Sequence, residues 1–130
     1  MTLTGINPDS LSRPRGYSHG MKGRGDLLFV AGQIGWNREG RMVSDDLADQ
    51  FAQALDNVLD VVWAAGGLPG SVARLTLYVI DKGEYRLRAK VIGEAYRKRM
   101  GKHFPAMTLV EVKALLEDDA KVEIEATALL

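Results

Sequence analysis

The sequence contains no cysteine, no excess of either charge and no long apolar run. The absence of cysteine excludes disulfides, thiolate metal ligands and a cysteine nucleophile. The 17 Lys and Arg residues balance the 17 Asp and Glu residues, whereas proteins that bind nucleic acid usually carry a basic surplus. No apolar stretch approaches a membrane span in length, and the opening MTLTGINPDS lacks the basic start and apolar core of a secretion signal. We therefore expect a cytoplasmic protein.

The composition is that of an ordinary folded protein. Of the 130 residues, 46% are apolar and 26% are charged, which is typical of globular rather than disordered chains. A chain of this length suits one hydrophobic core. No repeat, linker or low-complexity segment is visible, so residues 1–130 are expected to form a single domain.

The spacing of the apolar residues predicts both strands and helices. A helical spacing begins at Asp46 and ends before Gly66, and a second one ends at Gly101. The first two predicted strands are expected to pair with each other around a turn. The predicted strands are 16–23, 27–34, 72–80, 107–115 and 121–129, and the predicted helices are about 46–65 and 84–100.

This order of elements predicts an α+β fold, in which a mixed β-sheet carries two helices on one face. In the last strand, Glu123 and Glu125 alternate with apolar residues, so both are expected on the uncovered face. A charged strand face is usually solvated. Apolar side chains are nevertheless expected on the same face, where one layer of helices leaves them exposed, and association through this face is therefore expected. These residues are Leu27, Phe29, Met107 and Leu109, beside Tyr78.

Five blocks of the sequence carry a resemblance to a known family. They are GYSHGMKGRGDLLFVAGQIGWNREG, DQFAQALDNV, AAGG, FPAMTLVEV and VEIEATA. In these blocks the chain resembles the RidA family, also called YjgF/YER057c/UK114. The resemblance implies a chorismate-mutase-like fold and a homotrimer whose sheets form a central barrel. It also implies three inter-subunit clefts that bind small carboxylic acids. Members of the best-known branch hydrolyse enamines and imines to 2-oxo acids and ammonia, without a metal or other cofactor.

The resemblance assigns roles to individual residues. Glu123 matches the carboxylate that holds the attacking water, and Tyr17 matches a tyrosine in the cleft that could donate a hydrogen bond. Gly32 matches a glycine whose backbone lines the pocket, and Thr108 and Leu109 fall where backbone amides meet the ligand. Glu123 and Tyr17 are thus candidate catalytic residues, and the other three are candidates for substrate binding.

Met107 departs from the family pattern. Deaminases of the family have an arginine after Phe-Pro-Ala, and that arginine grips the substrate carboxylate. A thioether offers neither charge nor a hydrogen-bond donor, and the loss of one charged pair costs about 2–5 kcal/mol. Met107 is therefore expected to make the substrate-binding pocket more apolar, and ordinary 2-imino acids are expected to be turned over poorly.

Another cation could replace the missing arginine. His19 lies two residues beyond Tyr17 on an extended segment, so both rings should project to the same side. Because histidine titrates near neutrality, His19 could act as a catalytic acid, base or conditional cation. The alternative is an exposed histidine on an edge strand. Three arginines are further candidates: Arg13, Arg15 and Arg74.

Three functions from different classes stay open on the sequence. The first is an enzyme that acts on a small enamine, imine or related acid. The second is a non-catalytic trimer that binds a metabolite or a protein partner. The third is an endoribonuclease, which the neutral charge balance favours least. No metal site is expected, because His19 and His103 are isolated and His103 is predicted on a surface loop.

Overall fold

A mixed four-stranded sheet and a layer of helices form the body of the molecule within residues 3–130, the part of the chain that the computed structural model describes. The sheet has the strand order β3-β6-β4-β5, and a separate small sheet pairs β1 with β2. The elements are β1 (Thr4–Ile6), β2 (Gly20–Lys22), β3 (Leu27–Gln33), α1 (Leu47–Ala64), the 3-10 helix η1 (Pro69–Ser71), β4 (Val72–Val79), α2 (Lys82–Leu87), α3 (Ala89–Met100), β5 (Ala106–Glu111) and β6 (Val122–Leu129).

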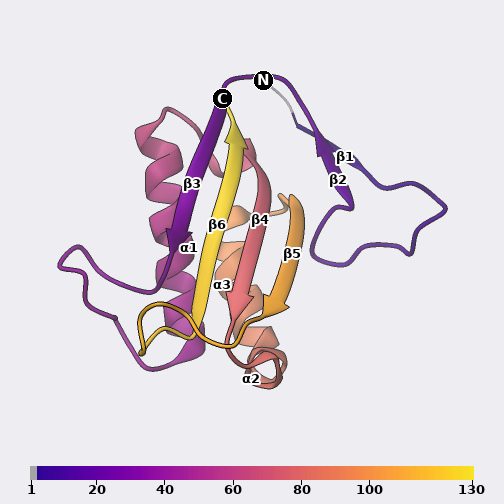
Figure 1. Cartoon of the computed structure of the whole chain (residues 1–130). Coiled ribbons are helices and arrows are strands. Elements are labelled where there is room, and N and C mark those ends of the chain that lie inside the picture. The colour runs from indigo at the N-terminus through magenta and orange to yellow at the C-terminus, as the bar shows by residue number, and fades with distance from the viewer. Residues whose placement is uncertain (1–2) are drawn as a thin grey trace.

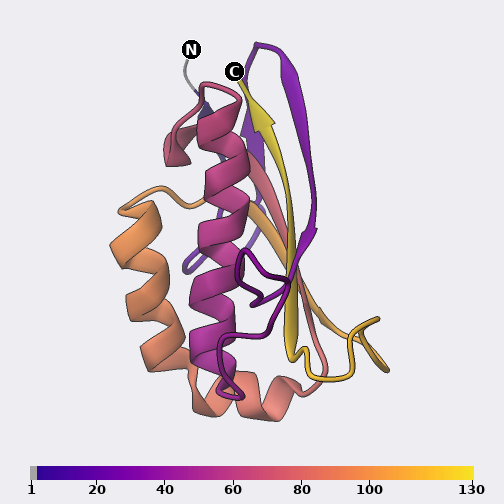
Figure 2. The ribbon, with the colours of Figure 1, turned by 90° about the vertical axis from the view of Figure 1, so that its left-hand side faces the viewer.

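The helices cover one face of this sheet and leave the other open. β4 and β5 run parallel, whereas β6 is antiparallel to both of its neighbours, β3 and β4. Figure 1 looks onto the open face, with α1 and α3 behind the strands, and Figure 2 shows the two layers from the side. The predicted α+β fold, with a mixed sheet and helices on one face, is confirmed.

The helix α1 begins where the sequence supplies a capping side chain. The carboxylate of Asp46 accepts a hydrogen bond from the backbone N–H of Asp49 at 3.0 Å, which satisfies one of the free N–H groups of the first turn. The helix ends before Gly66, whose φ of 90° lies in the left-handed region that favours glycine. Both ends of the predicted helix are therefore close to those observed.

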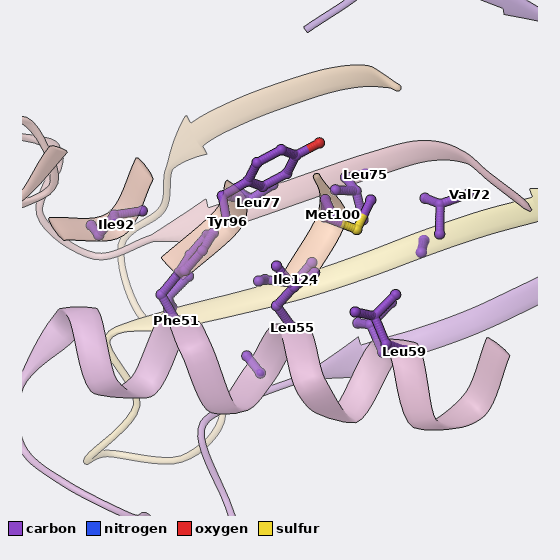
Figure 3. Close-up of a cluster of buried hydrophobic side chains, with 14 of the residues drawn as sticks. Phe51, Leu55, Leu59, Val72, Leu75, Leu77, Ile92, Tyr96, Met100 and Ile124 are labelled. Carbon is purple, nitrogen blue, oxygen red and sulfur yellow. The ribbon is translucent and has the colours of Figure 1, made fainter. Parts of the chain in front are cut away.

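The core lies between α1, α3 and the covered face of the sheet. Phe51, Leu55 and Leu59 of α1 point toward the sheet, and Ile124 of β6 lies among them (Figure 3). The second helix contributes Ile92, Tyr96 and Met100, all buried. Burying apolar area on this scale is the main stabilising contribution to the fold, at about 25 cal/mol per Å².

The predicted helix at 84–100 is two helices. α2 and α3 are separated by Arg88, whose φ and ψ of −97° and 8° depart from helical values. The guanidinium of Arg88 donates hydrogen bonds to both carboxylate oxygens of Asp46, at 2.9 and 3.1 Å. This contact joins the break to the start of α1, and no local spacing of apolar residues could have indicated it.

The predicted pairing of segments 16–23 and 27–34 is wrong. β2 pairs with β1, and the two form an arm that projects beyond β5 (Figure 1). β3 pairs instead with β6, with Leu27 opposite Leu129. The arm is attached to the sheet at Ser18, whose N–H donates to the carbonyl of Pro105 at 3.0 Å and whose hydroxyl donates to the carbonyl of Phe104 at 2.7 Å.

Among the residues that the structure describes, no helix has both the length and the apolarity needed to cross a bilayer. The longest helix, α1, has 18 residues and an outer face with polar and charged side chains.

Candidate functional site

Two glutamates of β6 lie on the open face of the sheet, as predicted, but their surroundings differ. The hydroxyl of Tyr78 donates a hydrogen bond to Glu125 at 2.5 Å. This bond, followed by desolvation and the charges of Glu125 and Glu123, raises the pKa of Tyr78 above its ordinary value. Within residues 3–130 the carboxylate of Glu123 has no hydrogen-bond partner. Glu125 is therefore engaged, and Glu123 is free to hold a water molecule or a ligand.

The backbone of Gly32 lies directly against the Glu123 carboxylate. The pairing of β3 with β6 is interrupted between Val30 and Gln33, and this irregularity brings Gly32 beside Glu123. A Cβ atom on Gly32 would come within 2.1 Å of Oε2 of Glu123, far inside ordinary contact. Glycine at position 32 thus leaves the space that the carboxylate occupies.

Met107 and Leu109 lie on the covered face, so their predicted place beside Glu123 is wrong. β5 pairs with β4 in a register that sets Met107 beside Leu75 and Leu109 beside Leu77. Both β4 leucines are buried under the helices. Neighbouring residues in register share a face of the sheet, and the apolar spacing of β5 therefore follows the core rather than the open face.

An apolar cavity opens between β5, α3 and the segment that carries Tyr17. Its volume is ≈ 380 Å³. Tyr17, Met107 and Leu109 are part of its lining, so three of the predicted site residues do meet there. The other lining residues come from the core and from the surrounding helices and loops: Arg15, Gly16, Phe51, Leu55, Leu75, Leu77, Tyr85, Ala89, Ile92, Gly93, Tyr96, Arg97, Phe104 and Ile124.

Aromatic side chains give the cavity a rigid wall. The ring of Tyr96 stacks on that of Phe104, with centroids 5.9 Å apart. The hydroxyl of Tyr96 donates to the carbonyl of His103 at 2.6 Å. Burial raises the pKa of Tyr96 and, to a smaller extent, that of Tyr85. Both phenols therefore stay neutral at physiological pH, and the wall of the cavity adds no negative charge.

His19 packs against Tyr17 in an edge-to-face contact, with ring centroids 5.4 Å apart and planes at 83°. Its Nε2 lies 2.7 Å from the carbonyl oxygen of Ser12, and its ring is outside the cavity lining. The expected meeting of the two rings is confirmed. His19 therefore contacts Tyr17 without lining the cavity itself.

The remaining predicted residues lie apart from the cavity. Thr108 is exposed on the open face, in register with Thr76. His103, predicted on a surface loop, is half-buried, and its Nε2 lies 2.7 Å from the carbonyl oxygen of Val72. Across residues 3–130, no three His, Asp or Glu side chains gather in a group that could hold a metal ion.

Sequence reasoning missed the contribution of α2 and α3 to the cavity. Tyr85, Ile92 and Arg97 all line it, and none was a candidate. The helical spacing of Tyr85, Ala89, Ile92 and Tyr96 was a signal that these residues share one face. What lies opposite that face depends on the parallel pairing of β4 with β5, which is not local.

Glu123 and Met107 cannot touch one small ligand within a single chain. They lie on opposite faces of the sheet, and β4 separates β6 from β5. Two strand spacings alone amount to about 10 Å. The residues of the predicted cleft therefore fall into two groups, which we call half-sites: Gly32 with Glu123, and Tyr17 with the cavity.

A largely apolar cavity at the edge of an α+β sheet is typical of proteins that bind small molecules. The sequence profile of the family described as Endoribonuclease L-PSP matches residues 9–130. The 2-iminobutanoate/2-iminopropanoate deaminase of Escherichia coli strain K12 is 38% identical over 104 residues, which cover 80% of each chain. The chain belongs to the RidA (YjgF/YER057c/UK114) family.

Solved structures agree with this assignment. YyfB of Yersinia pestis, from the conserved Rid protein family, superposes with a TM-score of 0.87 at 34% identity, over 100% of each chain. Escherichia coli TdcF, solved with bound serine, superposes with a TM-score of 0.70 at 29% identity, over 95% of this chain and 93% of the TdcF chain. The family thus includes proteins that bind small molecules.

Proposed function

We propose that this protein is a homotrimer that binds a small acid between subunits and hydrolyses its enamine or imine with a water held by Glu123. The observation that favours this most is the state of Glu123 on the open face. Its carboxylate has no partner within residues 3–130, although the neighbouring Glu125 is engaged by Tyr78. Gly32 leaves room for the Glu123 carboxylate at that position.

The arrangement of the half-sites supports a shared cleft. Tyr17 and the cavity lie on one side of the sheet, and Glu123 lies on the other. A second copy whose open face approaches the cavity would supply Glu123 to a ligand held by the first copy. The exposed open face also carries Leu27 and Phe29, which are 61% and 74% exposed, and association would bury them.

The reaction needs only groups that the two half-sites supply. Glu123 accepts a proton from water, and the water oxygen attacks the C=N carbon of the substrate. Tyr17 donates a hydrogen bond to the tetrahedral intermediate. The nitrogen then receives two protons, the one that Glu123 took from water and the one on the new hydroxyl group. The C–N bond breaks, ammonia leaves and a 2-oxo acid remains, so one water is consumed for each C=N bond broken. Met107 supplies no anchor for the carboxylate, and short 2-imino acids are therefore expected to be poor substrates.

Ammonia release from 2-imino acids generated in situ tests this proposal. Glu123→Gln should lower the rate by about a hundred-fold or more, because it removes the proton acceptor. Glu125→Gln is the matched control on the same strand and should retain most of the rate. Equal loss in both variants, or no loss in Glu123→Gln, would show that Glu123 is not the base.

Light scattering tests the assembly on which the cleft depends. A trimer is expected at micromolar concentration, and a stable monomer would remove the shared cleft. If the trimer forms and binds 2-oxo acids but releases no ammonia from any imino acid, the protein is the non-catalytic binding trimer instead.

A further inference from the structure

The cavity is larger and more apolar than a short 2-oxo acid requires. Its volume of ≈ 380 Å³ falls in the range of about 300–1,000 Å³ that holds drug-sized ligands. Met107, Leu109 and Ile92 line it together with five aromatic rings, those of Tyr17, Phe51, Tyr85, Tyr96 and Phe104. An acid with a methyl or ethyl side chain would leave most of this space unfilled.

Two free cations stand in an otherwise uncharged lining. Arg15 and Arg97 are exposed lining residues, and the described lining includes no Asp or Glu. Within residues 3–130, neither arginine has an acidic partner within salt-bridge distance. Both guanidinium groups are therefore available to an anionic ligand, for which a planar carboxylate is the natural match.

Gly93 explains how Arg97 reaches the cavity. Side chains of a helix lean toward its N-terminus, and Nη1 of Arg97 lies 3.2 Å from the point where a Cβ of Gly93 would stand. The guanidinium thus lies over the bare backbone one turn before its own Cα. Glycine inside a helix usually costs about 0.5–1 kcal/mol relative to alanine, and here it gives the arginine a path to the cavity.

The position of Arg97 near the end of α3 has a simpler reading, as a cation that offsets the helix dipole. Lys98 and Arg99 lie in the same last turn. Arg99 already donates to the carbonyl of Ala95 at 3.1 Å and pairs with Asp56 at 2.7 Å. Arg97 instead extends back along the helix to Gly93, which the dipole does not require.

We propose that Arg97, with Arg15 in the same cavity lining, is the carboxylate anchor of this protein and that its substrate is a 2-imino acid with a bulky apolar side chain. The side chain fills the cavity against Met107 and Leu109, while the carboxylate stays at the mouth with Arg97. The C=N carbon next to that carboxylate then also lies at the mouth, where a second copy can reach it. This inference rests on the proposed function only for the reaction, because the cavity and both arginines belong to one chain.

Calorimetric binding of two stable 2-oxo acids, phenylpyruvate and pyruvate, tests the anchor without any turnover. Phenylpyruvate should bind at least about ten-fold more tightly than pyruvate. Arg97→Gln should lower the affinity for phenylpyruvate at least about ten-fold. Lys98→Gln, one residue further along α3, is the matched control and should bind as the unmodified protein does. Gly93→Ala should raise the melting temperature yet weaken binding, because its methyl group displaces the guanidinium.

The opposite results overturn the anchor. The proposed anchor is refuted if the protein binds the two acids equally well or binds neither. It is also refuted if Arg97→Gln leaves the affinity for phenylpyruvate unchanged. These outcomes are independent of the reaction, because Glu123→Gln should still bind phenylpyruvate. Conversely, loss of ammonia release in Glu123→Gln with unchanged binding in Arg97→Gln would support the proposed reaction and refute the anchor.

Discussion

The substitution Gly32→Ala tests the contact that sets the position of Glu123. The added methyl carbon would stand 2.1 Å from Oε2 of the glutamate, whereas such atoms prefer about 3.5 Å. The carboxylate must therefore move by more than about 1 Å, a misplacement that can cost about a hundred-fold in rate. We expect Gly32→Ala to lower ammonia release from 2-imino acids by about that factor.

The same substitution should leave the fold intact. Gly32 is not among the glycines with positive φ, so alanine can adopt its backbone conformation, and the close contacts involve only the flexible side chain of Glu123. The change in unfolding free energy should stay within about 1 kcal/mol, measured by denaturant melts.

Two other glycines provide controls for Gly32→Ala. Gly70→Ala should change neither rate nor stability, because nothing lies within 4 Å of its added carbon. Gly35→Ala should instead destabilise the protein, because its Cβ would stand 2.7 Å from the Cα of Gln50. Full turnover in a well-folded Gly32→Ala variant would refute the argument that this contact positions the catalytic carboxylate.

Two further predictions follow from other contacts. Met107→Arg should raise the affinity for pyruvate relative to that for phenylpyruvate, measured by calorimetry, because a guanidinium beside Leu75 would occupy apolar space and supply a second anchor. A sharp fall in melting temperature with no gain in affinity for pyruvate would show that Met107 is only a core residue. Asp46→Ala should cost about 1 kcal/mol near neutral pH, as the loss of a helix cap does. The hydrogen bond from Asp49, and then Arg88, lower the pKa of Asp46, so its stabilisation is present above about pH 4 and disappears as the pH falls through the lowered value. Denaturant melts of both proteins should therefore converge in acid, and a difference that persists there would contradict this origin.

The elements of the body of the fold could be predicted because their apolar spacing is local. The alternation in β6 and β4 and the helical spacing of α1 each identify one buried face without reference to any other segment. The cap at Asp46 and the glycine after α1 mark the ends of that helix. For these segments, local pattern and tertiary packing agree.

The site was harder to predict because it depends on contacts distant in sequence. Met107 and Leu109 alternate with Thr108 in a way that fits the core equally well, yet they were expected among the apolar side chains of the open face that carries Glu123. The parallel pairing of β5 with β4 decides the face, and it separates residues that a family cleft is expected to bring together. The pairing of β2 with β1 is likewise a contact between segments that local spacing does not identify. The approach of Arg97 to Gly93 depends on side-chain geometry, which the sequence does not give.

The separation of the two half-sites by β4 has a genetic consequence. If each cleft takes Glu123 from one copy and Arg97 from another, a substitution of Glu123 and a substitution of Arg97 damage different half-sites of the cleft. Chains carrying Glu123→Gln, mixed with chains carrying Arg97→Gln, would then assemble some clefts in which both halves are intact. Two alleles that are each inactive alone would complement each other when expressed in the same cell, whereas two alleles altered in the same half would not.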